Sequence, residues 1–148
     1  MSDSSAIDQA LVDRLLSDAT LRALGPDGVF WEEAGASMAT GGNPTQFVIV
    51  SLIDEGDAAI FGGRAWEDGL YAVKFVELSS AAVHNVRAGA ARIDVLLEDQ
   101  PLTVAGYTPM TVHREARIRL TEVDDTDASI RWQHRGGHYR VQQARVAA

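Results

Sequence analysis

The sequence has no cysteine, and this absence excludes several kinds of site. Disulfides, zinc–thiolate sites, iron–sulfur clusters and a thiol nucleophile all require that residue. Long apolar runs are lacking as well, since no stretch approaches the roughly 20 residues that a membrane-spanning helix needs. The first residues are polar and acidic, unlike the cationic start of a secretory signal. We therefore expect a soluble protein, made in a cytoplasm and without a membrane partner.

Positive charge is scarce and unevenly placed. The 148 residues carry 21 acidic and 13 basic side chains, and Lys74 is the only lysine. Residues 1–107 hold 16 acidic and 6 basic side chains, a net charge of −10, whereas residues 108–148 hold 5 and 7, a net charge of +2. An acidic protein gains little from counterion release, so we expect no tight binding to nucleic acid. The arginines of the last third fit either an acidic protein partner or a solvated strand face.

The spacing of apolar residues predicts two helices and several strands. Helices are expected over residues 6–23 and 80–98, where apolar side chains recur three and four positions apart. Strands are expected at residues 29–32, 46–53, 58–61, 70–78, 102–105, 112–123 and within 130–146, the last region forming either one strand or two strands broken at Gly136–Gly137. This order predicts an α+β fold in a single domain over residues 1–148. Its mostly antiparallel sheet would carry two α-helices packed on one face.

Two of the expected strands have informative patterns. Residues 46–53 are apolar on both faces, so this strand needs cover on both sides, from helices or from another subunit. Residues 112–123 alternate, and the pattern places Ala116, Ile118 and Leu120 on an inner face. Arg117 and Arg119 then lie on the outer face. Arg114 is the exception, since it falls on the inner side.

Motifs that carry catalysis or bind cofactors are missing. The sequence contains neither a phosphate-binding loop nor a nucleophile elbow. His134 and His138 would oppose each other if Gly136–Gly137 formed a turn, but a metal site needs a third ligand. Paired carboxylates lie mostly in predicted turns, where they are usually solvated or satisfy the local backbone. We expect no catalytic residues, no cofactor and no metal.

The sequence does contain candidate residues for contact with other proteins. Trp66 lies in residues 62–69, which are predicted to be a turn or an exposed hairpin tip, and an exposed tryptophan there indicates a contact surface. The alternative is that Trp66 folds back over its own domain. Two acidic turns are also predicted, one at Asp54–Glu55 and one at Asp124–Asp125. These turns and the arginine face are the candidate interface of the protein.

The order of these segments is similar to that of a known family. The N-terminal helix reads ALVDRLLSDATLRAL and leads through VFWEEA to the strand QFVIVSLI. The strand LYAVKFVEL precedes a helical segment with AGAARIDVLLEDQPLTVAGY, and HREARIRL and WQHRGGHYRVQ follow. From about residue 8 to 144 the chain resembles the tail-completion proteins of long-tailed phages and gene-transfer particles, which include the tail terminators.

The resemblance implies a structural virion protein. Its members form a hexameric ring that caps the tail tube, stops its elongation and provides the docking surface for the head-side neck. The implied partners are further copies of the chain, the tail tube protein and the head-side neck or connector protein. DNA would pass through the lumen without specific binding. The implied location is the neck region of the virion tail, assembled in the host cytoplasm.

One interface hypothesis and three alternatives follow. In a ring, Asp54, Glu55, Asp124 and Asp125 would contact Arg117 and Arg119 of a neighbouring copy, because unlike patches meet head to tail. A head-side connector, that is a stopper or adaptor, would show similar features. A stand-alone small-molecule-binding or enzymatic α+β domain would instead have a deep pocket. A bacterial structural protein with a phage-like fold is the third alternative.

Overall fold

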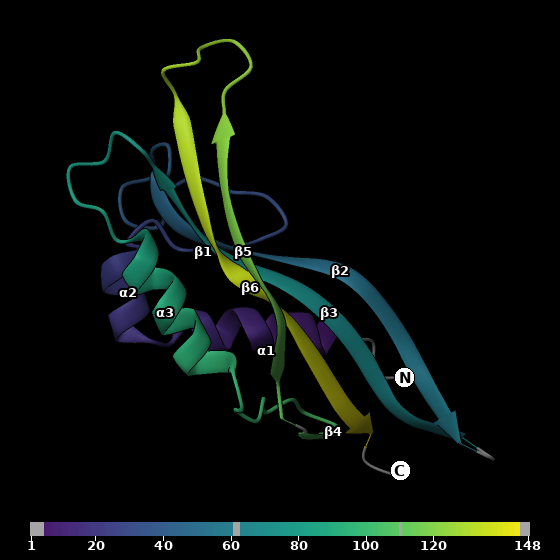
Figure 1. Cartoon of the computed structure of the whole chain (residues 1–148). Coiled ribbons are helices and arrows are strands. Elements are labelled where there is room, and N and C mark those ends of the chain that lie inside the picture. The colour runs from purple at the N-terminus through teal and green to yellow at the C-terminus, as the bar shows by residue number, and fades with distance from the viewer. Residues whose placement is uncertain (1–4, 61–62, 110, 146–148) are drawn as a thin grey trace.

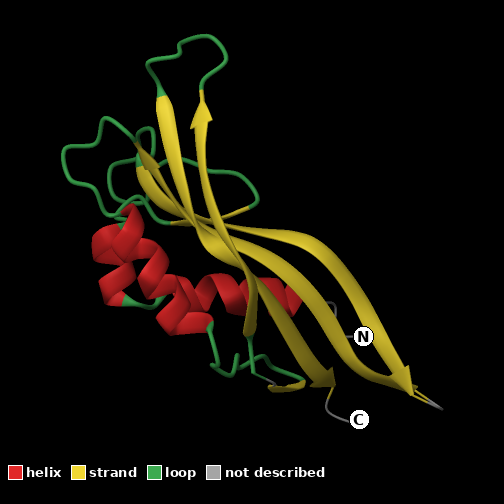
Figure 2. Ribbon diagram, in the orientation of Figure 1, coloured by secondary structure: helices red, strands yellow, loops and turns green. Residues whose placement is uncertain are grey.

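The computed structural model describes residues 5–60, 63–109 and 111–145, and in this part three helices cover one face of a six-stranded sheet (Figures 1 and 2). The single α+β domain predicted from the sequence is confirmed. The helices are α1 (Ser5–Leu16), α2 (Ala19–Leu24) and α3 (Val86–Leu97). The strands are β1 (Val29–Trp31), β2 (Gln46–Ile60), β3 (Gly63–Leu78), β4 (Tyr107–Pro109), β5 (His113–Val123) and β6 (Arg131–Arg145).

The sheet is mixed but mostly antiparallel. Its strand order is β1-β2-β3-β6, and the far side of β6 pairs with β5 along one half and with β4 near its end. Only β1 and β2 run parallel, with Val29 opposite Val48. Consequently β2 and β5 lie toward opposite edges of the sheet.

The first helix is interrupted, whereas a single helix over residues 6–23 was predicted. Asp18 ends the continuity because it is the N-cap of α2, where its carboxylate accepts a 2.8 Å hydrogen bond from the Leu21 amide. The same carboxylate receives both Arg92 Nε (2.8 Å) and Nη2 (2.7 Å) from α3. These hydrogen bonds from Arg92 lower the pKa of Asp18. One acidic side chain thus starts a helix and ties it to the next.

The clearest sequence signal, the helix over residues 80–98, is confirmed in its second part only. Helix α3 begins at Val86, and Val83 lies before it with 64% of its surface exposed. Ile93 and Leu97 are buried against the sheet as the seam predicted. The helix lies close to the sheet at Gly89, where a Cβ atom would lie 2.2 Å from Phe75 Cδ2. Glycine is therefore required at this helix–sheet contact.

Strands β2 and β3 form a long arm that extends beyond the helices (Figure 1). A turn was predicted at residues 54–57, and a turn or an exposed hairpin tip at residues 62–69. Strand pairing contradicts a turn at 54–57 and at 63–69. Pairing continues instead through Glu55 opposite Gly69 and Asp57 opposite Glu67. Residues 61–62 lie outside the described part of the chain. Cross-strand pairing thus overrides the turn-like composition of these segments.

Strand β6 is continuous, so of the two predicted forms, one strand or two strands broken at Gly136–Gly137, the structure has the unbroken one. A Cβ atom at Gly136 would lie 2.0 Å from the backbone oxygen of Val73 on β3. The glycine allows the two strands to approach closely and does not end either one. The short strand expected at residues 102–105 is absent, and β4 lies instead at Tyr107–Pro109.

Both faces of the strand at residues 46–53 are covered near its start, from within the chain. Val48 and Val50 are buried in the core beneath the helices. On the opposite, helix-free face, Phe47 packs between Phe30 and Trp132, with ring centroids 5.8 and 6.0 Å away. Cover ends farther along, since Ile53 is 48% exposed. From Ile53 to Gly56 the residues of β2 are exposed, so the cover of this strand ends where the arm begins.

Candidate functional site: two unlike edges of the sheet

Strand β5 is an open edge of the sheet. It pairs with β6 on one side, and no described strand pairs with its other side. Nearly all of its side chains are exposed, the exceptions being Arg114 and Ile118, which are half-buried. Leu120 and Val123 each have 44% of their surface exposed. An edge strand exposed on both faces is a ready site for contact with another chain.

A β-bulge between Arg114 and Ala116 reverses the expected faces of β5. Arg114 lies opposite Tyr139, whose side chain is in the core, so Arg114 is on the helix side. The bulge inserts one residue, after which Arg117 and Arg119 are also on the helix side. Ala116, Ile118 and Leu120 face the helix-free side. The predicted inner and outer faces are therefore wrong for these residues, and the exception at Arg114 marked the bulge.

The reversal produces a cleft lined by arginines between α3 and the β5–β6 pair. Arg117 and Arg119 of β5 and Arg135 of β6 line one end of it. Small side chains and the ring of a tyrosine also line the cleft, whose volume is about 420 Å³. Arg119 and Arg135 are direct cross-strand partners. Like charges opposite each other on two strands are destabilising, so an anion bound beside this pair would stabilise it.

Charge is balanced at one end of this cleft only. At the inner end, Asp94 accepts hydrogen bonds from Arg114 Nη1 at 2.6 Å and from the Tyr139 hydroxyl at 3.0 Å. At the outer end, none of the arginines has a carboxylate partner among the described residues; they are Arg87, Arg117, Arg119 and Arg135. Burial and the nearby guanidinium groups of Arg119 and Arg87 lower the pKa of Arg135. The outer end therefore attracts anions.

The opposite edge is acidic. Between residues 53 and 69, the two strands of the arm carry five acidic side chains and one basic one. Asp54 and Glu55 are exposed and make no ion pair with another described residue, whereas Asp68 is paired with Arg140 at 2.7 Å. Trp66 lies on the same arm with 37% of its surface exposed. Asp54 and Glu55 are adjacent on a regular part of β2 and not in the predicted turn, so their side chains point to opposite faces of the arm.

The second predicted acidic turn is real but lies far from the arm. Asp124 and Asp125 are at the tip of the β5–β6 hairpin, and Figure 1 places this tip and the β2–β3 arm at opposite ends of the molecule. Asp124 accepts hydrogen bonds from the hydroxyl and amide of Thr126, at 2.8 and 2.9 Å. These bonds lower its pKa. Asp124 therefore stabilises its own turn, and the four predicted carboxylates do not form one surface.

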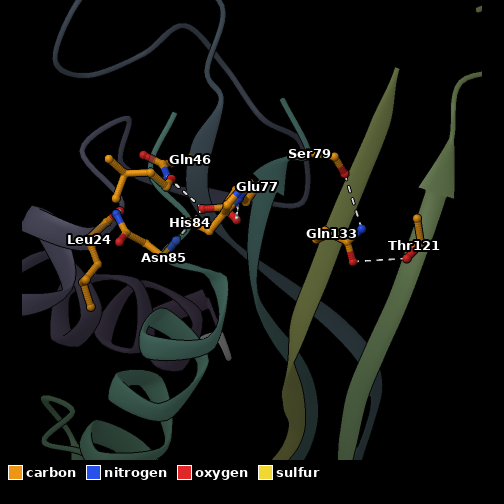
Figure 3. Close-up of polar contacts among 9 residues, drawn as sticks. Leu24, Gln46, Glu77, Ser79, His84, Asn85, Thr121 and Gln133 are labelled. Carbon is orange, nitrogen blue, oxygen red and sulfur yellow. Dashed lines mark hydrogen bonds and ion pairs between the residues drawn. The ribbon is translucent and has the colours of Figure 1, made fainter. Parts of the chain in front are cut away.

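A buried carboxylate, Glu77, organises the junction of β2, β3 and α3 (Figure 3). Its Oε1 accepts hydrogen bonds from Gln46 Nε2 at 2.7 Å and from the Asn85 amide at 2.6 Å. His84 Nδ1 lies 3.2 Å from its Oε2. Asn85 also donates to the Leu24 carbonyl at 3.1 Å, so the network reaches α2. Its donors come from β2 and from the start of α3, which indicates a structural role.

The histidines do not form a metal site together. His134 and His138 lie on one continuous strand, so they are roughly 13 Å apart at about 3.3 Å per residue. His134 is buried, and burial lowers its pKa, with Glu122 Oε2 3.1 Å from its Nε2. Another group, Glu98, Asp99 and His113, brings three potential ligand atoms within 4.8 Å of one another. Of these, Asp99 and His113 are exposed, and Glu98 accepts a hydrogen bond from the Arg114 amide.

The helix-free face has an apolar groove beside Phe47, Ile130 and Trp132, with a volume of about 710 Å³. None of the residues that line it is ionisable. Acid–base chemistry needs titratable groups in a cleft, so this groove offers no such reaction. No helix in the described part of the chain is both long enough and apolar enough to cross a bilayer.

Comparison with known proteins establishes the fold. The structure is similar to a chain in the virion of a native gene transfer agent particle, with a TM-score of 0.61 and 20% sequence identity. The match covers 94% of this chain and 96% of the other. A second solved structure matches 100% of this chain and 99% of its own, with a TM-score of 0.59 and 15% identity. No protein-family model and no curated protein sequence matches the chain.

Sequence reasoning missed two residues of these sites. Arg135 joins the cleft only because β6 runs unbroken beside β5, and the alternative of a break at the two glycines concealed that register. Glu77 is a charged residue near the end of an apolar strand, and such a residue is rarely buried without partners. The position of Glu77 in an apolar strand was therefore the sequence signal that could have identified it as a buried, hydrogen-bonded residue.

Proposed function

We propose that the chain is a ring-forming structural subunit of a phage-like virion, and specifically a tail terminator. What supports the proposal above all is the fold likeness to a gene transfer agent virion chain over nearly the full length of both chains. In this role the ring caps the tail tube, stops its elongation and presents a docking surface to the head-side neck. It is placed in the neck region of the tail after assembly in the host cytoplasm.

The two edges of the sheet also support a ring. A head-to-tail ring joins one surface of each copy to a different surface of the next. Strand β5 is open and carries unpaired arginines, and the β2 arm is open and acidic. The partners in this proposal are other copies of the chain, the tail tube protein and the head-side neck protein. DNA passes through the lumen without specific binding.

Two measurements test the proposal. Native mass spectrometry of the purified protein should give the mass of a closed hexamer, and a protein that stays monomeric at all concentrations would contradict a ring. The protein is then added to polymerising tail tube protein, and tube lengths are measured by electron microscopy. A tail terminator shortens the tubes and appears at one end. A head-side connector leaves tube length unchanged and binds the head-side neck proteins instead.

A further inference from the structure

The arginine cleft and the acidic arm lie at opposite edges of the same sheet. The cleft is formed where β5 lies beyond β6, and the arm of β2 and β3 extends past β1 at the other edge. Strand β1 pairs only with residues 48–50 of β2, and the Leu52 amide donates to Glu32 Oε1 at 3.2 Å, so the free edge of the arm begins at residue 53. Unlike surfaces at two edges can meet in a head-to-tail ring, in which the arm of one copy would lie beside the cleft of the next.

We propose that the outer end of the cleft, at Arg117, Arg119 and Arg135, binds the acidic arm of the next copy through one of two adjacent carboxylates, Asp54 or Glu55, which point to opposite faces of β2. This inference rests on the proposed function, because it specifies the contact that closes the ring. Guanidinium groups pair with carboxylates through two parallel hydrogen bonds, so the arginines of the cleft suit a carboxylate ligand.

Unpaired charges of opposite sign on the cleft and on the arm favour this contact. Arg119 and Arg135 repel each other across two paired strands, and Arg87 adds a third positive charge. Asp54 and Glu55 are exposed and unpaired among the described residues, and they lie on a segment of strongly negative charge. Asp124 satisfies its own turn, which leaves it less free to bind elsewhere. The arm is therefore the better partner of the two predicted acidic segments.

The contact also has an apolar component. Ile53 and Trp66 of the arm have 48% and 37% of their surface exposed. Ile53 directly precedes Asp54 on β2, and Trp66 directly precedes Glu67 on β3. Ala90 and Ala91 of α3 line the cleft with small side chains and leave room for a bulky one. Aromatic anchors surrounded by charged pairs are typical of the residues that dominate binding between proteins.

Two charge-reversed variants test the contact. The cleft variant carries Arg117→Glu with Arg119→Glu, and the arm variant carries Asp54→Arg with Glu55→Arg. We expect each variant alone to lose the ring mass in native mass spectrometry, because like charges then meet. A control matched to the cleft variant, Arg22→Glu with Arg131→Glu, makes the same change in net charge as that variant. Its changes are at exposed residues outside the cleft, so it should keep the ring. Circular dichroism confirms that each variant is folded.

Mixing the two variants gives the decisive result. In an alternating ring, the acidic arm of the cleft variant meets an arginine cleft, and the arginine arm of the other meets a glutamate cleft. Equal mixing should therefore restore a ring that contains equal numbers of the two variants, and placing all four changes in one chain should restore it too.

Three outcomes would overturn the inference without refuting the proposed function, which is tested by a separate outcome. Rings that survive in both variants would show that another contact closes them. Loss of the ring without rescue by mixing would show that the arm is not the occupant. Fluorescence anisotropy with a labelled DNA duplex detects a phosphate ligand: binding by the wild-type protein that the cleft variant loses would assign the cleft to nucleic acid. A wild-type protein that forms no ring would refute the proposed function itself.

Discussion

At the scale of single residues, the most consequential side chain in the core is Glu77. It is fully buried, yet it accepts hydrogen bonds from Gln46 and from the Asn85 amide and lies beside His84. Glu77→Ala would leave these buried donors without an acceptor and would open a cavity. We expect it to lower the free energy of unfolding by about 3 kcal/mol, measured by urea denaturation.

Two companion variants separate the network from a general effect of charge. Glu77→Gln keeps one acceptor oxygen and should lose less stability than Glu77→Ala. Glu33→Ala removes an exposed carboxylate and should change stability by no more than about 0.5 kcal/mol. If Glu77→Ala unfolded at the same urea concentration as Glu33→Ala, the network would contribute nothing to stability.

At the scale of elements, the close approach of β6 and β3 depends on Gly136. A methyl group there would overlap the Val73 carbonyl, which lies 2.0 Å from the Cβ position. We expect Gly136→Ala to lower the free energy of unfolding by about 2 kcal/mol or more, since backbone atoms cannot move aside easily. Thermal unfolding measures the change.

A second glycine of the same sheet serves as its control. A Cβ atom at Gly56 would meet no atom within 4 Å, and its φ is not positive. Gly56→Ala should therefore be neutral, or stabilise by about 0.5 kcal/mol through the unfolded chain. Equal melting temperatures for the two variants would rule out the steric explanation.

The sequence predicted elements whose apolar pattern the tertiary structure uses directly. Ile93 and Leu97 marked the buried side of α3, and the apolar run from Phe47 marked a central strand. The arm and β6 were predicted poorly, because Asp54–Asp57 and Gly136–Gly137 have the composition of turns while pairing with distant strands. Arg117 and Arg119 were predicted to share one face, and both line the same cleft in the structure. The direction of that face depends on a bulge, which the exception at Arg114 in the alternation had signalled.

At the scale of the whole molecule, the sheet has a basic edge and an acidic edge, and salt should therefore control assembly. Charges at such edges are partly exposed, and the Debye length falls from about 10 Å at 0.1 M salt to about 3 Å at 1 M. We expect the ring to dissociate progressively as sodium chloride rises over this range. Light scattering coupled to size-exclusion chromatography gives the mass at each concentration.

Screening should act on the charged contact and spare the fold. The core is apolar and lies under the helices, so the circular dichroism spectrum should stay constant over the same range of salt. A ring whose mass is unchanged at 1 M salt would be held by apolar contacts, and the groove beside Trp132 would then be the surface to examine.

The bulge between Arg114 and Ala116 has a consequence for how such a subunit can diverge. Beyond the bulge, the face to which each β5 side chain points depends on the one inserted residue. Loss of that residue would turn the guanidinium groups outward and the aliphatic ones inward in a single event, without altering any other codon. Short insertions and deletions at this position are thus a direct route by which related chains could exchange one neighbour for another.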